Sequence, residues 1–140
     1  MTGGLYNDAI LAEAKAGHGG GTLPPPAVSV TCDNPLCGDR VMVDLHRSGP
    51  RIDGFAQRTR GCLLTQAAAS VVGRHATGAT ADEFRAAAGQ LRRLLAGEAV
   101  APVWPELAMF APVATVPSRH ECVLLPFEAL AAALERADQA

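Results

Sequence analysis

Apolar and polar residues alternate in three short segments of the first half of the chain. The segments cover residues 28–31, 41–45 and 52–59, and Gly, Pro or Asn residues stand between them. This pattern is typical of strands that bury one face. Because the connections at residues 34–39 and 46–50 are short, we expect the three strands to pair as an antiparallel meander.

Helical spacing of apolar residues characterises the second half of the chain. Residues 63–75 predict one helix, closed by Gly78. A second helix is predicted after Thr80, because Thr80 and Glu83 form the capping-box pattern, and Gly97 should end it. The apolar positions of this second helix share one face, as in a helix that packs on a core: Phe84, Ala87, Ala88, Leu91, Leu94 and Leu95.

The last helix is predicted to follow another capping-box pattern, which runs from Ser118 to Glu121. Cys122 comes directly after it and therefore falls in the first turn. Pro126 should kink this helix or make its first turn irregular. The Pro-rich stretch 102–117 before it is expected to form a short helical turn packed on the core.

A looser helical stripe lies near the N-terminus, with Thr2 as the candidate N-cap. Its apolar positions are Leu5, Tyr6, Ala9, Ile10 and Ala14. Residues 17–26 are rich in Gly and Pro, so we expect a flexible linker there. The predicted fold class is α+β, a three-stranded antiparallel sheet covered by helices, in a single domain over residues 1–140.

Composition narrows the function classes. The chain has 140 residues, of which 49% are hydrophobic, and a net charge of −2. It lacks the basic surface that binding to nucleic acid requires. Lys15 is the only lysine, which argues against lysine-based covalent catalysis. No apolar run reaches the roughly 18–20 residues of a membrane helix, and the N-terminus lacks a signal-peptide pattern, so we expect a cytoplasmic protein.

Three of the four cysteines, with one aspartate, form a candidate metal site. In a reducing cytoplasm, cysteines more often serve as metal ligands or reactive thiols than as disulfide partners. Cys62 and Cys122 each stand at a predicted helix start, where the helix dipole stabilises a thiolate. Cys37 lies in a Gly-containing turn, and Asp39 follows it by two residues. The spacing contains no pair of C-x-x-C motifs, and Asp39 could instead cap its own turn.

The remaining cysteine and the histidines are weaker candidates. Cys32 is expected to face the core or the sheet surface as a small hydrophobic residue. His120, two residues before Cys122, is a candidate for contact with the metal or a passing substrate. The other histidines are interpreted as solvated or as compensating a helix dipole: His18, His46 and His75.

The motif at residues 34–39, Asn-Pro-Leu-Cys-Gly-Asp, is followed by Gly61-Cys62, the small-residue run 67–70 and Cys122. With Leu5-Tyr6 near the N-terminus, the chain resembles the IscU/SufU family of iron–sulfur cluster assembly proteins over nearly its whole length. This U-type scaffold fold is also found at the N-terminus of NifU. The resemblance implies a three-stranded antiparallel sheet covered by helices. It also implies that the metal or cluster is bound by four residues: Cys37, Asp39, Cys62 and Cys122.

Three features resemble the SufU branch more than the IscU branch. Glu121, and not His, precedes Cys122, and an extra helix begins at Thr80. Residues 115–119 lack the Leu-Pro-Pro-Val-Lys motif that IscU-like members offer to their chaperone. SufU-like proteins bind zinc through Cys, Asp, Cys and Cys. They accept persulfide sulfur from a PLP-dependent, SufS-like cysteine desulfurase and pass it to the downstream assembly machinery.

Three functions follow from this resemblance. The first is zinc-dependent sulfur transfer, with Cys122 as the sulfur acceptor, which would make the protein a sulfurtransferase. The second is a non-enzymatic scaffold, in which the same four ligands assemble a transient [2Fe–2S] cluster. The third is a structural zinc-binding module, in which the metal is inert.

Overall fold

The computed structural model describes residues 7–36 and 38–139. Three predictions concern residues outside this part of the chain. They are the N-cap at Thr2, the helical positions Leu5 and Tyr6, and the ligand Cys37. The predicted sheet is confirmed. Its strands are antiparallel and lie in the order β1-β2-β3. Their bounds are β1 (Val28–Asn34), β2 (Asp39–Ser48) and β3 (Arg51–Arg60).

All three strands are longer than the alternating pattern predicted. β2 begins at Asp39, which is the last residue of the turn that we predicted over residues 34–39. It also continues past His46, where a β-bulge between His46 and Arg47 shifts the pairing with β3. The bulge lets the strand continue through a segment that reads as a turn in the sequence. Apolar residues of the two longer strands face the core and are buried: Val41, Val43, Leu45, Ile52 and Phe55.

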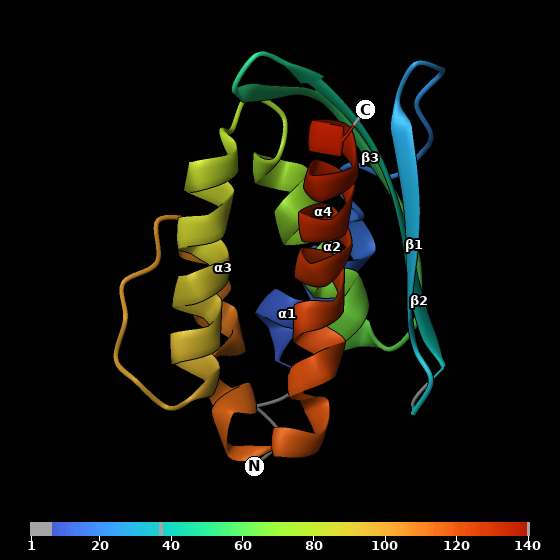
Figure 1. Cartoon of the computed structure of the whole chain (residues 1–140). Helices are drawn as coiled ribbons and strands as arrows, with labels where there is room; N and C mark the ends of the chain where they lie inside the picture. The colour runs from blue at the N-terminus through green and yellow to red at the C-terminus, as the bar shows by residue number, and fades with distance from the viewer. Residues whose placement is uncertain (1–6, 37, 140) are drawn as a thin grey trace.

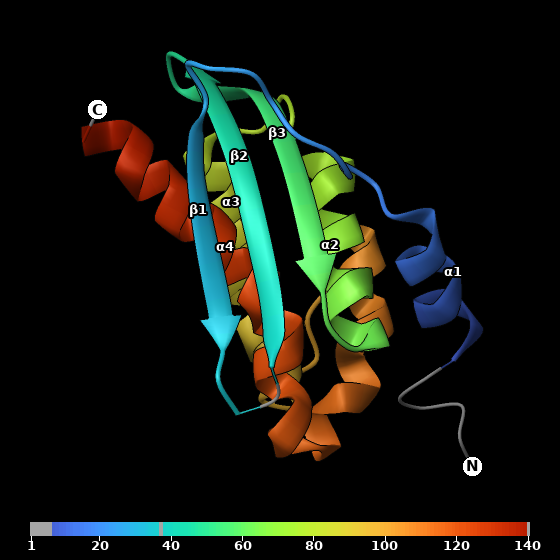
Figure 2. The ribbon, with the colours of Figure 1, turned by 90° about the vertical axis from the view of Figure 1, so that its right-hand side faces the viewer.

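The helices gather on one face of the sheet (Figure 1; Figure 2). α4 (His120–Gln139) packs across β1 and β2, and α2 (Leu63–His75) packs against β3 and α4. α1 (Asp8–Ala16) lies on α2. α3 (Ala81–Leu95) contacts α4 and the 3₁₀ segment η1 (Pro105–Thr115). The fold class is therefore α+β, as predicted.

Most helix boundaries agree with the sequence, and two do not. α2 has the predicted bounds, and the capping box between Thr80 and Glu83 is present. The N-cap of α1 is Asn7, whose side chain accepts from the Ile10 N–H. α2 is capped at its C-terminus by Ala76 in the right-handed region, and not by Gly78.

The entry to α4 also differs from the prediction. Ser118 lies inside a second 3₁₀ turn, η2 (Pro117–Arg119), which runs directly into α4. The expected cap at Ser118 is therefore wrong, because helical geometry has already begun before that residue. The Pro-rich stretch before it forms a longer 3₁₀ segment than the single turn we expected. α4 continues through Pro126.

Three aromatic rings hold α3 and the 3₁₀ region to α4. Phe84, Trp104 and Phe127 have ring centroids 6.0–6.2 Å apart. All three side chains are buried. At these separations the rings add tilted and offset contacts to the burial of apolar surface. This cluster fixes the second half of the chain around the start of α4.

Residues 17–26, predicted as a linker, run along the free edge of β3 (Figure 2). The backbone N–H of Gln57 donates to Gly19 O over 2.8 Å, and that of Gly21 donates to Gln57 O over 3.1 Å. The N–H of Leu23 donates to Oδ2 of Asp44. The two bonds with Gln57 occupy polar groups of the edge strand β3 that would otherwise be open to pairing with another chain. Flexibility of this segment stays a prediction.

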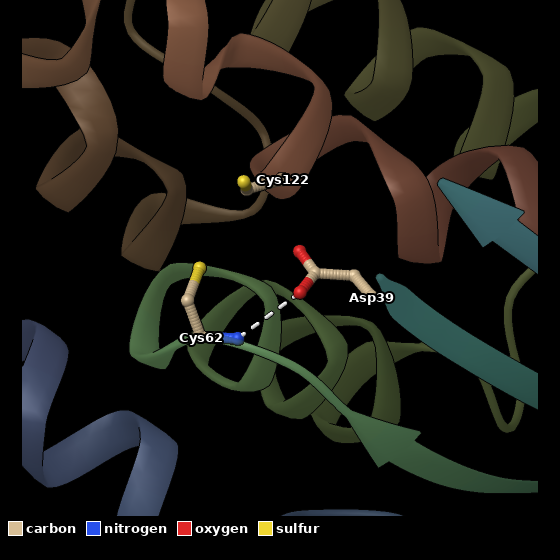
Figure 3. Close-up of side chains that lie close together, drawn as sticks. All are labelled: Asp39, Cys62 and Cys122. Atoms are coloured by element: carbon tan, nitrogen blue, oxygen red, sulfur yellow. Dashed lines mark hydrogen bonds between the residues drawn. The ribbon is translucent and has the colours of Figure 1, made fainter. Parts of the chain in front are cut away.

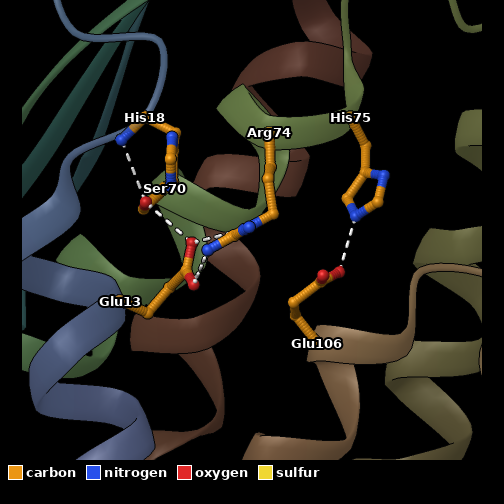
Figure 4. A network of polar contacts seen from close by, with 6 residues as sticks. All are labelled: Glu13, His18, Ser70, Arg74, His75 and Glu106. Carbon is orange, nitrogen blue, oxygen red and sulfur yellow. Dashed lines mark hydrogen bonds and ion pairs between the residues drawn. The ribbon is translucent and has the colours of Figure 1, made fainter.

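A buried polar network joins α1, the segment after it and α2 (Figure 4). Glu13, buried on α1, accepts from the Ser70 hydroxyl over 2.8 Å and from the Arg74 guanidinium over 2.8 Å. The backbone N–H of His18 donates to the same Ser70 hydroxyl. Since a buried carboxylate is stable only when paired and hydrogen-bonded, α1 is fixed to α2 by specific contacts.

None of the helices in the described part of the chain is both long and apolar enough to span a membrane.

Candidate metal centre

Three of the four predicted ligands converge at one end of the sheet (Figure 3). Asp39 comes from the start of β2, Cys62 from the start of α2 and Cys122 from the first turn of α4. One ligand atom from each lies within 4.8 Å of the others. Metal ligation by these residues stays a prediction, as does the role of Cys37.

The Asp39 side chain is directed away from its own turn and toward α2. It is 4% exposed. Its Oδ1 accepts the backbone N–H of Cys62 over 3.3 Å, and its Oδ2 accepts the Thr65 hydroxyl over 2.6 Å. The turn before it is closed by Asn34, whose backbone and side-chain oxygens accept the N–H groups of Gly38 and Leu36. Asn34 thus performs the turn-capping role that we had considered for Asp39.

Cys62 is the N-cap residue of α2. Its Sγ makes no capping hydrogen bond with the described residues and lies 3.4 Å from the Thr65 hydroxyl. The residue before it must be small, because a Cβ on Gly61 would lie 2.7 Å from Asp39 Oδ1. Gly61 therefore allows the carboxylate to approach the helix start.

Cys122 is the third residue of α4 and is 1% exposed. Its Sγ lies on the opposite side of the Asp39 carboxylate from the Cys62 backbone (Figure 3). The predicted placement of both cysteines at helix starts is confirmed. Because Cys62 is the N-cap of α2, the dipole of that helix favours a negatively charged ligand at this position.

His120 lies outside this group of three residues. Its Nε2 donates to the carbonyl oxygen of Val113 over 3.0 Å, and Ala114 O is 3.3 Å away. The ring therefore caps the end of η1. Of the other histidines, two form carboxylate pairs that the sequence did not predict: His46 with Asp53, and His75 with Glu106 (Figure 4).

Cys32 is half-buried on β1 and also lies outside the group. Burial raises the pKa of its thiol, and the nearby carboxylates of Glu128 and Asp33 raise it further. A cysteine in this setting remains a neutral thiol at physiological pH. It packs against the core, as predicted.

The donor set fits zinc or an iron–sulfur cluster. Both centres are bound by thiolates, and zinc also accepts carboxylate oxygen. Around a tetrahedral zinc ion, ligand atoms lie about 3.5–3.8 Å apart. The three ligand atoms lie within 4.8 Å of one another, so they would have to move closer to bind one zinc ion. Cys37, two residues from Asp39, would supply the fourth ligand.

Sequence reasoning missed Thr65. The residue is fully buried at the third position of α2, and its hydroxyl contacts both Asp39 and Cys62. A hydroxyl three residues after a helix-starting cysteine is the signal that could have identified it, because residues i and i+3 share a helix face.

Comparison with known proteins agrees with this geometry. No family model matches the chain. A NifU-like protein (N-terminal) from Brucella abortus is similar in structure, with a TM-score of 0.92 and 34% identity over 98% of this chain and 96% of that chain. The chain belongs to the IscU/NifU-like family of iron–sulfur cluster assembly scaffold proteins.

Two further proteins are similar to the chain. An iron–sulfur cluster assembly scaffold protein IscU from Streptococcus pyogenes serotype M1 is 27% identical over 139 residues, covering 97% of this chain and 86% of the relative. A scaffold protein for the SUF system from Fervidobacterium islandicum AW-1 has the same fold, with a TM-score of 0.87 and 24% identity over 96% and 99% of the two chains.

Proposed function

We propose that this protein acts in iron–sulfur cluster assembly as a SufU-like sulfur acceptor. In this proposal zinc is bound by Cys37, Asp39, Cys62 and Cys122, and the sulfur comes from the persulfide of a PLP-dependent, SufS-like cysteine desulfurase. The observation that carries the proposal is the convergence of three ligand groups, distant in sequence, within 4.8 Å. The thiol ligands require a reducing compartment, so we place the function in the cytoplasm.

The transfer step exchanges one disulfide-type bond for another. The Cys122 thiolate attacks the terminal sulfur of the desulfurase Cys–S–SH group. A new S–S bond forms on Cys122, the S–S bond of the desulfurase breaks, and the desulfurase thiolate leaves. No external oxidant or reductant is consumed. Bound zinc would keep the cysteine ligands deprotonated at neutral pH.

Access to Cys122 requires a movement. Only 1% of this residue is exposed, so the residues that cover it must shift when the desulfurase docks. Two apolar side chains close to the candidate ligands are available for docking. Leu36, in the turn before Asp39, is 93% exposed, and Leu63, next to Cys62, is 36% exposed. Both lie beside ligand residues, where the desulfurase persulfide must approach.

The transient [2Fe–2S] scaffold is the second candidate function, with the cluster as cargo. Asp39 favours it, because a carboxylate is a weaker iron–sulfur ligand than a thiolate and promotes release of the cluster. In that case Asp39→Ala retains a cluster that the parent protein loses. Faster loss from the variant than from the parent contradicts this function.

A single sulfur-transfer experiment separates the two functions. The protein is incubated with a cysteine desulfurase and cysteine, and its cysteine peptides are examined by mass spectrometry for one added sulfur atom. We expect the added sulfur on the Cys122 peptide, its loss in Cys122→Ser, and full retention in Cys32→Ser. Sulfur on Cys62 alone contradicts the assignment of Cys122. Iron and acid-labile sulfide in the purified protein support the scaffold function instead.

A further inference from the structure

The side chain of Thr65 contacts two members of the ligand group, Asp39 and Cys62. It is fully buried in α2. Its hydroxyl oxygen lies 2.6 Å from Asp39 Oδ2 and 3.4 Å from Cys62 Sγ. The first contact is short enough for a charge-assisted hydrogen bond, which is stronger than a bond between neutral groups.

The hydroxyl of a helical threonine has another common partner, the carbonyl four residues earlier. For Thr65 that carbonyl belongs to Gly61, and it accepts the side-chain amide of Gln66 over 2.9 Å. The Cys62 carbonyl accepts the backbone N–H of Gln66 over 3.0 Å. The Thr65 hydroxyl is instead directed to the carboxylate. Its single proton is donated to Asp39.

The two hydrogen bonds to Asp39 fix the plane of its carboxylate. Oδ1 accepts from Cys62 N–H over 3.3 Å, which is long, and Oδ2 accepts from Thr65 over 2.6 Å, which is short. Thr65 therefore supplies the stronger of the two restraints. A carboxylate has about four lone-pair sites on its two oxygens, so a carboxylate held by α2 is still able to bind a metal ion.

We propose that Thr65 is a positioning residue that orients the Asp39 carboxylate toward the cysteine ligands and thereby sets the affinity of the site for its metal. This inference rests on the proposed metal-binding function. Hydrogen bonds to the ligands of a metal typically contribute ten- to a hundred-fold to metal affinity. Without the hydroxyl, the carboxylate rotates about its side-chain bonds and the site loses its fixed oxygen ligand.

Three variants separate positioning from packing. Thr65→Val keeps nearly the same volume and removes the hydroxyl, whereas Thr65→Ser keeps the hydroxyl. Ser70→Ala is the matched control, because Ser70 is also fully buried on α2 and donates to a carboxylate, Glu13, away from the candidate metal centre. Thr65→Ala provides the same comparison if the valine variant does not fold.

The test is metal binding by the purified, metal-free chain. Cobalt(II) is titrated and its visible spectrum recorded, and the zinc dissociation constant is measured by competition with a chromophoric chelator. We expect Thr65→Val to raise the zinc dissociation constant at least about ten-fold and to shift the cobalt d–d bands. Thr65→Ser and Ser70→Ala should match the parent in both measurements.

Different results identify different failures. If the parent binds cobalt and zinc and Thr65→Val matches it in affinity and spectrum, the positioning role is wrong while the metal-binding function stands. If Ser70→Ala weakens binding as much as Thr65→Val, the effect comes from destabilising α2, and the positioning role is again wrong. If the parent binds neither metal, the proposed function itself is wrong, and the inference with it.

Discussion

The backbone N–H of Cys62 donates a hydrogen bond to Oδ1 of Asp39 over 3.3 Å, across 23 residues of sequence. The bond joins the start of α2 to the start of β2, and both ends of it belong to residues that we propose as ligands. The relative placement of these two residues is therefore part of the fold. Changes that separate these two residues should weaken the site without unfolding the chain.

Gly61→Ala is the most local of these changes. The new Cβ would lie 2.7 Å from Asp39 Oδ1 and 2.8 Å from its Cγ, so the carboxylate must move. We expect the zinc dissociation constant to rise about ten-fold or more, in line with the loss of other ligand-orienting contacts. Competition with a chromophoric chelator measures it. Gly89→Ala, whose Cβ meets nothing within 4 Å, is the control. Equal affinity of Gly61→Ala and the parent would falsify the requirement for glycine.

Asp44 provides a prediction about acid stability. Hydrogen bonds from Arg58, and also from Ser29 and the Leu23 N–H, outweigh the effect of burial and lower the pKa of Asp44 to about 2. A lowered carboxyl pKa stabilises the fold above the unfolded value of 3.8, and this stability is lost as the pH falls through about 2.

Asp44→Asn should therefore lower the free energy of unfolding at neutral pH by about 2 kcal/mol. The substitution should also flatten the dependence of stability on pH between about 4 and 2. An asparagine at position 44 does not titrate, so the folded and unfolded chains no longer differ in protonation there. Urea unfolding at a series of pH values measures both effects. A variant with the parent's slope in that range would show that another group controls acid stability.

Gly73→Ala tests how the segment after α1 is attached. A Cβ at Gly73 would lie 2.0 Å from the His18 carbonyl oxygen, which belongs to the backbone and cannot turn aside. We expect a loss of about 1–3 kcal/mol of stability, as for other overpacked sites. Amide hydrogen exchange in α1 should become faster, since the His18 bond to Ser70 is disturbed. If exchange in α1 is unchanged, this contact does not hold the helix in place.

The reactivity of Cys32 follows from its surroundings. Burial, Glu128 and Asp33 raise the pKa of its thiol. Alkylation of the Cys32 peptide, followed by mass spectrometry, should be slower than that of a free thiol at neutral pH and should accelerate as the pH approaches the raised pKa. Glu128→Gln should move this acceleration to lower pH. If Glu128→Gln moves the acceleration to higher pH, or leaves it unchanged, Glu128 does not raise the pKa of the thiol.

Much of the fold could be predicted because its signals are local. The alternation of apolar residues and the short turns specified the meander, and the Thr80 capping box specified the start of α3. The contacts missing from the prediction are between distant residues. Glu13 and Ser70 are 57 residues apart, and neither side chain reveals its partner in the sequence. The 3₁₀ segment before α4 was underestimated because its prolines obscure helical periodicity.

The candidate site could be predicted for a similar reason. A cysteine at a helix start can be recognised from the local sequence, and two of them with Cys37 and Asp39 formed the candidate site. The resemblance to the IscU/SufU family then implied that these residues share one metal or cluster, and three of them lie within 4.8 Å of one another. His120 lies near Cys122 in sequence but outside the group, because sequence proximity says nothing about the direction of its ring, whose Nε2 donates to Val113 O. Thr65 escaped notice because its partner, Asp39, lies on another element.

The central claim, that Asp39, Cys62 and Cys122 share one metal, is tested most directly by metal content. The chain is purified without added metal, and zinc and iron are measured per chain for the parent, Cys62→Ser, Cys122→Ser and the control Cys32→Ser. We predict about one zinc ion per chain in the parent and the control, and little in the other two variants. A parent with neither metal, or a Cys62→Ser variant with the full zinc content of the parent, would contradict the account.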